Sequence, residues 1–158
     1  MRNGIVAGAL APSLRYVDPI TQACTTANWF PSVAYAIFWR ETISGEVAGL
    51  WPSAADVISS DGGHGLGQLT ESYPPDWADP YANALYAIDH FLKGAEVYWA
   101  FDVQGEDLVR CIAAEYNAGR ARTIEAHDKG NVDLATTDGY AAAVLGFYRS
   151  ILATGKPT

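Results

Sequence analysis

Residues Val33–Ser44 read Val-Ala-Tyr-Ala-Ile-Phe-Trp-Arg-Glu-Thr-Ile-Ser, and Pro31 stands just before them. The run is apolar almost to its end, which predicts a buried helix that begins near Pro31 and carries one carboxylate, Glu41. Residues three and four apart share a helix face, so Glu41 should lie over Ile37 and Phe38. A carboxyl group on the apolar side of a helix loses water, and this desolvation raises its pKa. A general acid that works near neutral pH needs such a raised pKa.

A second interpretation of this stretch makes Glu41 a partly exposed carboxylate at a helix end. In that case it pairs with Arg40 or with a more distant basic residue, and it stays ionised. This stretch alone does not favour one interpretation over the other. The rest of the chain has to decide between them.

The composition limits the class of protein. The chain has 158 residues, of which 49% are hydrophobic, and this predicts one folded domain. Its formal net charge is −8, from 18 acidic and 10 basic side chains. This balance argues against nucleic acid and against anionic membrane surfaces as partners, because both select basic surfaces. A polysaccharide partner stays open, and the five Trp and nine Tyr suit either a dense core or a sugar-binding cleft.

The sequence contains no cluster of the His, Cys, Asp or Glu type that holds a metal. His64, His90 and His127 are isolated from one another, so we expect no metal and no cofactor. Cys24 and Cys111 both fall in stretches that read as helical. Their spacing leaves open whether they form one disulfide or remain two buried thiols.

No span is long and apolar enough to cross a bilayer, so we expect no membrane insertion. Gly4–Ala11 is apolar and follows Arg2, as the core of a signal peptide would. It is short, however, and runs directly through Pro12 into an expected helix at Leu14. We therefore expect a chain without an export signal.

The other periodic segments also predict helices. Asp79-Pro80 supplies a cap and a first-turn proline for the clearest of them, whose core-facing stripe we give no catalytic role. The stripe consists of Tyr81, Leu85, Ile88, Leu92, Ala95 and Trp99. Further helices are expected from Ser13 to about Cys24, over Gln104–Asn117 with Gly119 as the stop, and from Asp138 onward. Residues 120–137 are polar and irregular. No strand is indicated, so we predict a mainly α single domain with its core over residues 14–153.

Residues 45–67 show no sustained period and predict a long loop, a kind of segment that often carries function in compact domains. Asp61–Thr70, at its end, reads Asp-Gly-Gly-His-Gly-Leu-Gly-Gln-Leu-Thr. The density of glycine here allows a ligand to approach the main chain closely. A phosphate-binding loop is a weak alternative, because no Lys-Ser/Thr pair follows the glycines.

Four short motifs, in order, resemble the catalytic domain of the soluble lytic transglycosylases and its relatives, the goose-type lysozymes. They are Ala36-Ile-Phe-Trp-Arg-Glu-Thr42, Gly65-Leu-Gly-Gln68, Tyr116-Asn-Ala-Gly119 and Thr136-Thr-Asp-Gly-Tyr140 with Val144-Leu145 and Tyr148. They are similar, respectively, to that family's helix ending in a catalytic Glu-Ser, its Gly-Leu-Met-Gln, its Tyr-Asn-Ala-Gly and its final Thr-x-x-Tyr helix. Each motif alone is weak, but four in order over residues 14–151 form a specific pattern. The resemblance implies a lysozyme-like fold.

The chain departs from the family pattern at three positions. Thr42 replaces the usual serine and keeps its hydroxyl group. Gly67 replaces a methionine that packs against the sugar in the family, so we expect a more open wall there. Glu115 replaces the usual alanine; it could point toward the core and the cleft, but we favour a solvated charge at the helix end.

The resemblance implies cleavage of the β-1,4 bond between N-acetylmuramic acid and N-acetylglucosamine in peptidoglycan glycan strands. Glu41 would protonate the leaving glycosidic oxygen as an oxocarbenium-like centre develops. The same group, now ionised, would act as base for the sugar's own 6-hydroxyl, and a 1,6-anhydro ring would form without water. The muramoyl N-acetyl group can help to stabilise the cation, so a second carboxylate is not required.

The family's tyrosines carry over as supports of Glu41. Tyr116 is expected to hydrogen-bond Glu41 and hold its rotamer. Tyr140 is expected to line the cleft near Glu41, although a core tyrosine on an amphipathic helix is nearly as good an interpretation. Both roles follow from the resemblance and not from spacing.

The loop and the helix end receive binding and supporting roles from the same resemblance. Gln68, with the loop backbone from Gly65, would hold the N-acetyl or hydroxyl groups of the sugar. Asn117 would cap its helix and support the glycine-rich loop.

Hydrolysis, the goose-type outcome, is the close alternative. An inverting hydrolase uses a second carboxylate, about 6.5–9.5 Å from the first, to activate water. Asp61 is the best candidate for that role, but Thr70 stands where goose-type enzymes have another aspartate. A non-catalytic glycan-binding or structural module is the alternative from another class; a pure binder has no need of the acid.

The setting follows from the same resemblance. A wall-cleaving domain without an evident export signal resembles phage-encoded lysins and virion-associated enzymes, the alternative being a bacterial enzyme whose signal is absent from this sequence.

Overall fold

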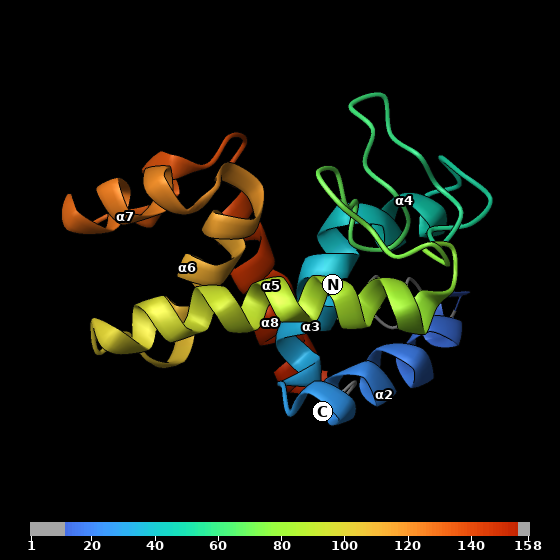
Figure 1. Ribbon diagram of the computed structural model, residues 1–158, viewed down its shortest axis with the longest axis horizontal. Helices are drawn as coiled ribbons and strands as arrows, with labels where there is room; N and C mark the ends of the chain where they lie inside the picture. Colours follow the sequence, from blue (N-terminus) through green and yellow to red (C-terminus); the bar gives the residue numbers. More distant parts are fainter. Residues whose placement is uncertain (1–11, 155–158) are drawn as a thin grey trace.

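The structure, a computed structural model, describes residues 12–154 (Figure 1). The helical segments are η1 Pro12–Tyr16, α2 Val17–Ala27, α3 Pro31–Phe38, η2 Trp39–Ile43, α4 Ser44–Val47, α5 Pro80–Ala100, α6 Gly105–Ala118, α7 Arg120–Asp128, η3 Val132–Ala135 and α8 Tyr140–Thr154. Within residues 12–154 there is no strand, only isolated bridges in the loop before α5. The prediction of a mainly α protein is confirmed. The expectation for Gly4–Ala11 lies outside the described residues.

The helix α5 crosses the middle of the molecule, with α2 packed along one part of it and α6 along another (Figure 1). It begins where predicted, because the Asp79 side chain accepts a hydrogen bond from the Ala82 N–H at 2.8 Å and Pro80 occupies the first turn. The predicted stripe is only partly right. Trp99 is 45% exposed, whereas Phe91 and Tyr98 are buried. Since two neighbouring helices cover α5, its buried surface is wider than one stripe and is turned away from Trp99.

The stretch from Pro31 forms a buried helix, as expected, with Pro31 in its first turn and every side chain from Val33 to Phe38 buried. The α-helical hydrogen bonding stops at Phe38, however, and Trp39–Ile43 forms a π-helical turn before α4. Single π-helical turns inside helices occur frequently at functional sites. Glu41 lies in the middle of this turn.

The last third of the chain is more helical than predicted. Arg120–Asp128 forms α7 although its sequence shows no apolar period, because it buries only two small side chains, Thr123 and Ala126. The final helix begins at Tyr140 and not at Asp138. Asp138 and Gly139 both have left-handed backbone conformations, with φ of 53° and 63°, which no α-helix can include.

Cys24 and Cys111 are both buried, and both are free thiols. Burial raises the pKa of Cys24 to about 12 and that of Cys111 to about 11. The two thiols are therefore neutral near pH 7. Of the two alternatives that the sequence left open, the structure supports two buried thiols and not one disulfide.

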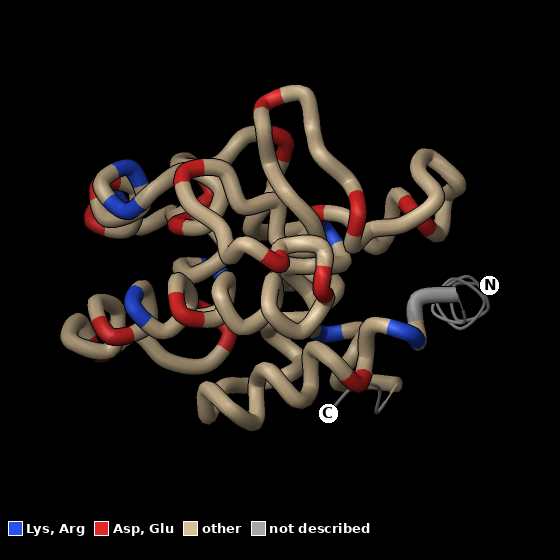
Figure 2. Tube along the Cα trace, turned by 45° about the vertical axis from the view of Figure 1, so that its right-hand side comes forward, with Lys and Arg blue, Asp and Glu red and all other residues tan. Residues whose placement is uncertain are grey.

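Acidic residues are spread over the molecule and basic ones are sparse (Figure 2). Within residues 12–154, no helix combines the length and the apolar character needed to span a membrane. The long loop between α4 and α5 lies above one end of α5, and α6 and α7 lie toward its other end (Figure 1). The candidate site lies between these two parts.

Candidate functional site

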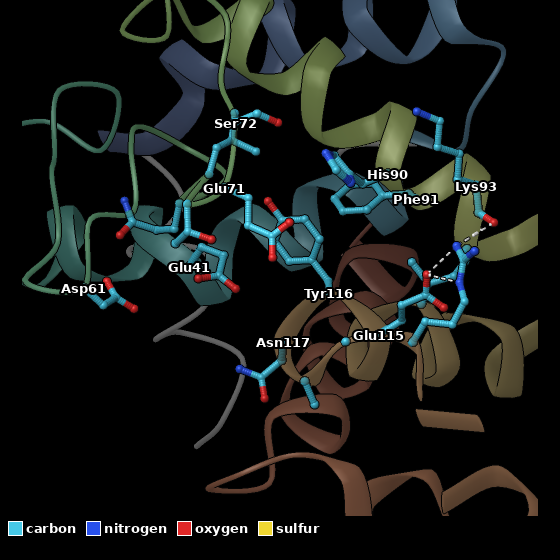
Figure 3. Close-up of a pocket in the computed structure, with 18 of the residues that line it drawn as sticks. Glu41, Asp61, Glu71, Ser72, His90, Phe91, Lys93, Glu115, Tyr116 and Asn117 are labelled. Carbon is cyan, nitrogen blue, oxygen red and sulfur yellow. Dashed lines mark hydrogen bonds and ion pairs between the residues drawn. The ribbon is translucent and has the colours of Figure 1, made fainter. Parts of the chain in front are cut away.

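A pocket of about 780 Å³ is shared by the long loop, α5 and the end of α6 (Figure 3). Its loop side contributes Asp61, Gln68 and Glu71, and Glu41 reaches it from η2. Its helical side is lined by His90, Phe91, Lys93, Gly94, Glu115, Tyr116, Asn117 and Arg120, among others. The α5 helix, to which the sequence assigned no role in the chemistry, therefore provides part of the pocket wall.

Glu41 is a partly buried carboxyl group at the loop side of this pocket. Burial raises its pKa, and the negative charge of Asp61 adds to that increase. A hydrogen bond from Tyr140 and the positive charge of Arg40 act in the opposite direction but do not cancel the effect of burial. The result is the first of the two interpretations of the sequence, a carboxyl group that holds its proton to higher pH.

Tyr140, from the first turn of α8, donates a hydrogen bond from its hydroxyl to Oε1 of Glu41. Burial raises the pKa of Tyr140 well above its usual value, so its hydroxyl remains a donor. The Arg40 guanidinium lies 5.4 Å from the centroid of the Tyr140 ring, within cation–π distance. Arg40 thus holds the tyrosine and adds a positive charge near Glu41 without pairing directly with its carboxylate.

The sequence-based role of Tyr116 was wrong, because its hydroxyl donates to the Gly67 carbonyl and not to Glu41. Its ring packs edge-on against Phe91, with 5.0 Å between the ring centroids. Burial raises the pKa of Tyr116 far above its usual value, and the nearby Glu41 adds to this. Tyr116 therefore ties α6 to the glycine-rich loop, and the bond predicted for it belongs to Tyr140.

Asn83, a buried residue of α5 that the sequence did not single out, holds the glycine-rich loop. Its Oδ1 accepts from the Gly67 N–H at 2.8 Å, and its Nδ2 donates to the carbonyls of His64 and Trp77 at 3.0 and 2.9 Å. Gly65 packs so closely that an added Cβ would lie 2.5 Å from the Asn83 side chain. A polar residue inside an otherwise apolar helix face was the only available signal.

Thr42 connects the Glu41 turn to the same loop. Its hydroxyl donates to the Leu66 carbonyl at 2.9 Å, and its own carbonyl accepts from the Trp51 indole N–H at 3.1 Å. Carbonyl groups in a π-helical turn point in directions different from those in an α-helix, and here the Trp51 indole satisfies the Thr42 carbonyl. The Thr42 hydroxyl therefore links the turn that carries Glu41 to the glycine-rich loop through a hydrogen bond.

The glycine at position 67 does not open the wall of the site as expected. A Cβ there would lie 2.9 Å from the Tyr116 hydroxyl and 3.1 Å from the Ala87 Cβ, so the space is filled by neighbouring atoms. Gln68 lines the pocket, and its Nε2 donates to the Gly65 carbonyl at 2.9 Å. Its Oε1 makes no hydrogen bond to a described residue and packs against Gly63, where an added Cβ would lie 2.8 Å from it.

Asp61 lines the same pocket as Glu41, from an exposed position on the loop. Its carboxylate accepts a hydrogen bond from the Ser59 hydroxyl, which together with backbone N–H groups holds its pKa below the usual value. Glu71, which no sequence motif indicated, also lines the pocket and extends between Glu41 and Tyr116 in the view of Figure 3. The only sequence feature that pointed to Glu71 was its position directly after Thr70, where goose-type enzymes have an aspartate.

The end of α6 differs from the expectations for both of its polar residues. Asn117 is exposed and lines the pocket, and within residues 12–154 its side chain makes no hydrogen bond to the loop that it was expected to support. The Glu115 side chain is only 14% exposed, so it is not a solvated charge. It accepts from the Tyr98 hydroxyl at 2.8 Å and pairs with Arg120 at 2.8 Å. Glu115 packs closely against Gly94 of α5, and the lack of a side chain at Gly94 leaves the space that Glu115 occupies.

Over the described range, no three His, Cys, Asp or Glu side chains gather in a way that could hold a metal ion. The polar groups that line the pocket are instead carboxyl groups, the cations Lys93 and Arg120, and the amide side chains of Gln68 and Asn117. No family model matches the sequence, and no curated protein matches it either. The functional conclusion therefore depends on the residues and their geometry.

Proposed function

We propose that this protein is a peptidoglycan lytic transglycosylase with a lysozyme-like fold, and that Glu41 is its general acid and then its base. The observation that carries the proposal is the environment of Glu41: a desolvated carboxyl group with a raised pKa, held by a tyrosine, beside a pocket large enough for sugar residues. The order of the four motifs supports the same substrate.

The hydrogen bond from Tyr140 to Oε1 leaves Oε2 of Glu41 as the oxygen that carries the proton. In the first step this proton moves to the glycosidic oxygen as the bond from that oxygen to the muramoyl C1 breaks. The positive charge that develops at C1 is then stabilised by the N-acetyl group of the same sugar.

In the second step the muramoyl 6-hydroxyl attacks C1, and the ionised Glu41 takes its proton. The ring closes to the 1,6-anhydro product, and Glu41 returns to its protonated form. The Tyr140 bond and the Arg40 charge stabilise the carboxylate between the two steps, because both favour its ionised form. A carboxyl group that changes charge twice in a cycle needs both burial and such partners.

The loop supplies the groups that would hold the sugar. Gln68 lines the pocket, and the glycine-rich backbone next to it is fixed by Asn83, Thr42 and Tyr116. Preorganised polar groups on a fixed backbone position a substrate without a cost of reordering at the moment of reaction.

Hydrolysis is the second candidate, and one observation favours it. Asp61 and Glu71 line the same pocket as Glu41, so a second carboxylate is available to activate water. The two outcomes differ in their products and not in the bond that is cut.

The test is the loss of turbidity of a peptidoglycan suspension, followed by mass spectrometry of the soluble fragments. We expect the wild type to clear the suspension, Glu41→Gln to be inactive, and the fragments to carry anhydromuramoyl ends. Reducing ends would replace the proposal by hydrolysis. An inactive wild type, or a Glu41→Gln variant as active as wild type, would leave only the binding or structural module.

A further inference from the structure

The cations of the pocket lie on one side of it. Glu41, Asp61 and Glu71 lie on its loop side, whereas Lys93 of α5 and Arg120, the first residue of α7, line its other side together with Glu115. Figure 3 shows Asp61 at one edge of the pocket and Lys93 at the opposite edge, with Tyr116 between them. A negatively charged group on a ligand is repelled at the first edge and meets cations at the second.

Arg120 is held in place by a partly buried acid, Glu115. Its Nε and Nη2 both donate to Oε1 of Glu115, at 3.0 and 2.8 Å, and Nη2 also donates to the Lys93 carbonyl at 3.1 Å. Glu115 is itself fixed by the Tyr98 hydroxyl. Nη1 of Arg120 makes no hydrogen bond to a described residue, and the side chain is 46% exposed. The guanidinium is thus oriented before any ligand arrives, with one nitrogen free.

Lys93 is the second cation at this side. It pairs with Asp89 at 2.5 Å, but both side chains are more than half exposed, at 62% and 58%. Such an exposed pair contributes little free energy, so Lys93 can exchange Asp89 for a ligand carboxylate at little cost. The chain offers a close copy of this arrangement in Lys129 and Glu125, at 2.6 Å with 59% and 68% exposure. That copy does not line the pocket.

We propose that Lys93 and Arg120 bind a carboxylate of the peptide stem that projects from the glycan strand, so that the protein prefers strands with charged stems. This inference rests on the proposed function, which puts the sugars beside Glu41 and leaves the stem to cross the pocket. An acidic chain of net charge −8 repels an acidic polymer as a whole. Local cations at one side of the pocket would offset this repulsion and orient the strand, since arginine is well suited to carboxylates.

The experiment uses uncross-linked peptidoglycan strands in two forms, both with acetylated amino groups. One form keeps the stem carboxylates, and in the other they are coupled to methylamine and so carry no charge. The measured quantity is the ratio of kcat/KM for the charged form to kcat/KM for the amidated form. We expect a ratio of about ten for the wild type, the usual effect of one hydrogen bond to a charged group. Arg120→Gln should reduce it most, and Lys93→Gln by a smaller factor.

The controls are matched to these variants. Lys129→Gln removes a lysine from the equivalent exposed pair, and Arg122→Gln removes an exposed arginine from the same helix that does not line the pocket. Both should keep the wild-type ratio. Because Arg120→Gln leaves Glu115 without its cation, the double variant Glu115→Gln/Arg120→Gln is measured beside it and should show the same low ratio.

A binding measurement tests the stem-carboxylate site separately from the proposed enzymatic function. Glu41→Gln is mixed with each form of the strands and sedimented, and we expect more protein to bind the charged form, with a difference that shrinks as salt is added. Equal ratios in the wild type and in all variants, with active enzyme, would overturn the stem-carboxylate site and leave the proposed function intact. A wild type that cuts neither form, but still binds the charged form better through Lys93 and Arg120, would overturn the proposed function and retain the site.

Discussion

Two glutamates five residues apart on one helical stretch have pKa values that move in opposite directions. Burial raises the pKa of Glu41, which receives one hydrogen bond from Tyr140. Burial also acts to raise the pKa of Glu46, but Glu46 accepts from the Tyr16 hydroxyl at 2.6 Å, the Ala54 N–H at 2.7 Å and Arg15 at 2.6 Å. These bonds together outweigh burial and hold its pKa below the usual value.

The comparison shows that a hydrogen bond from a tyrosine does not by itself offset the increase in pKa that burial causes in a carboxyl group. Both glutamates accept such a bond, and only Glu46 also has a direct cation and a backbone N–H. The cation near Glu41, Arg40, stacks on the tyrosine ring and does not pair with the carboxylate. Glu46 is thus a structural link between η1 and α4, whereas the raised pKa of Glu41 supports the role of proton donor that we propose for it.

The largest expected difference between the two glutamates is in activity. Glu41→Gln should lower the rate of peptidoglycan cleavage by about 10²–10⁴-fold, the usual contribution of a positioned general acid. Glu46→Gln should retain activity and instead lower the free energy of unfolding by about 1–2 kcal/mol, because it weakens bonds to a charged group. Turbidity assays and urea denaturation of both variants check this. A Glu46→Gln variant as inactive as Glu41→Gln would show that the division of roles is wrong.

The next effect concerns the tyrosine partners. Tyr140→Phe should lower kcat by roughly tenfold, the scale of one lost hydrogen bond to a charged group. Since the Tyr140 bond lowers the pKa of Glu41, its loss should also move the alkaline limb of the pH–rate profile to higher pH. Tyr16→Phe is the matched control at Glu46 and should leave the profile unchanged. An unshifted alkaline limb in Tyr140→Phe would mean that Glu41 does not set it.

A smaller effect should appear in the way the free energy of unfolding depends on pH. The folded protein holds the Glu41 proton above the ordinary carboxyl pKa of 4.5, so the stability from this group is present at low pH and lost as pH rises through the raised pKa. Glu41→Gln should therefore gain stability over the wild type across that window, by about 1 kcal/mol for each pH unit that the window spans.

Glu46 should behave in the opposite way, because its lowered pKa contributes stability above 4.5 that is lost as pH falls through the folded-state pKa. Urea denaturation at a series of pH values, for the wild type, Glu41→Gln and Glu46→Gln, measures both slopes. Parallel curves for the two variants would contradict the opposite directions of the two pKa values.

The smallest effect is expected from the exposed acid of the loop. The negative charge of Asp61 raises the pKa of Glu41, so Asp61→Asn should shift the alkaline limb slightly to lower pH and change kcat by no more than about threefold. Glu71→Gln, on the same side of the pocket, is measured in parallel. A loss of a hundredfold or more in either variant, with reducing ends among the products, would identify that residue as the base of a hydrolase.

Local chemistry explains which parts of the fold were predictable. Pro31, Asp79-Pro80 and Gly119 act through their own backbone or side chain within a few residues, so the starts of α3 and α5 and the end of α6 could be predicted. By contrast, α7 was missed because it buries too few side chains to leave a periodic pattern. The π-helical turn at Glu41 was missed because a change from α to π bonding leaves no mark in apolar spacing.

The candidate site was predictable in its members more than in its contacts. Motif order pointed to Glu41, Gln68, Tyr116 and Tyr140, and all four lie at or beside one pocket. We assigned the hydrogen bond to Glu41 to the wrong tyrosine. The sequence cannot distinguish two tyrosines on two different helices, because only the packing of those helices determines which hydroxyl reaches Glu41. Asn83 and Glu115 could not be assigned for the same reason: their contacts with Gly67, His64 and Tyr98 form only when the loop and the helices pack together.

The sequence alone determined the helices with strong local signals and one carboxylate on an apolar helix, because periodicity and caps act over a few residues. Only the tertiary structure decided the charge of that carboxylate. Its protonation depends on the water removed by packing and on Tyr140, 99 positions further along the chain. Desolvation and long-range partners are properties of the assembled fold, and no spacing within a single helix contains them.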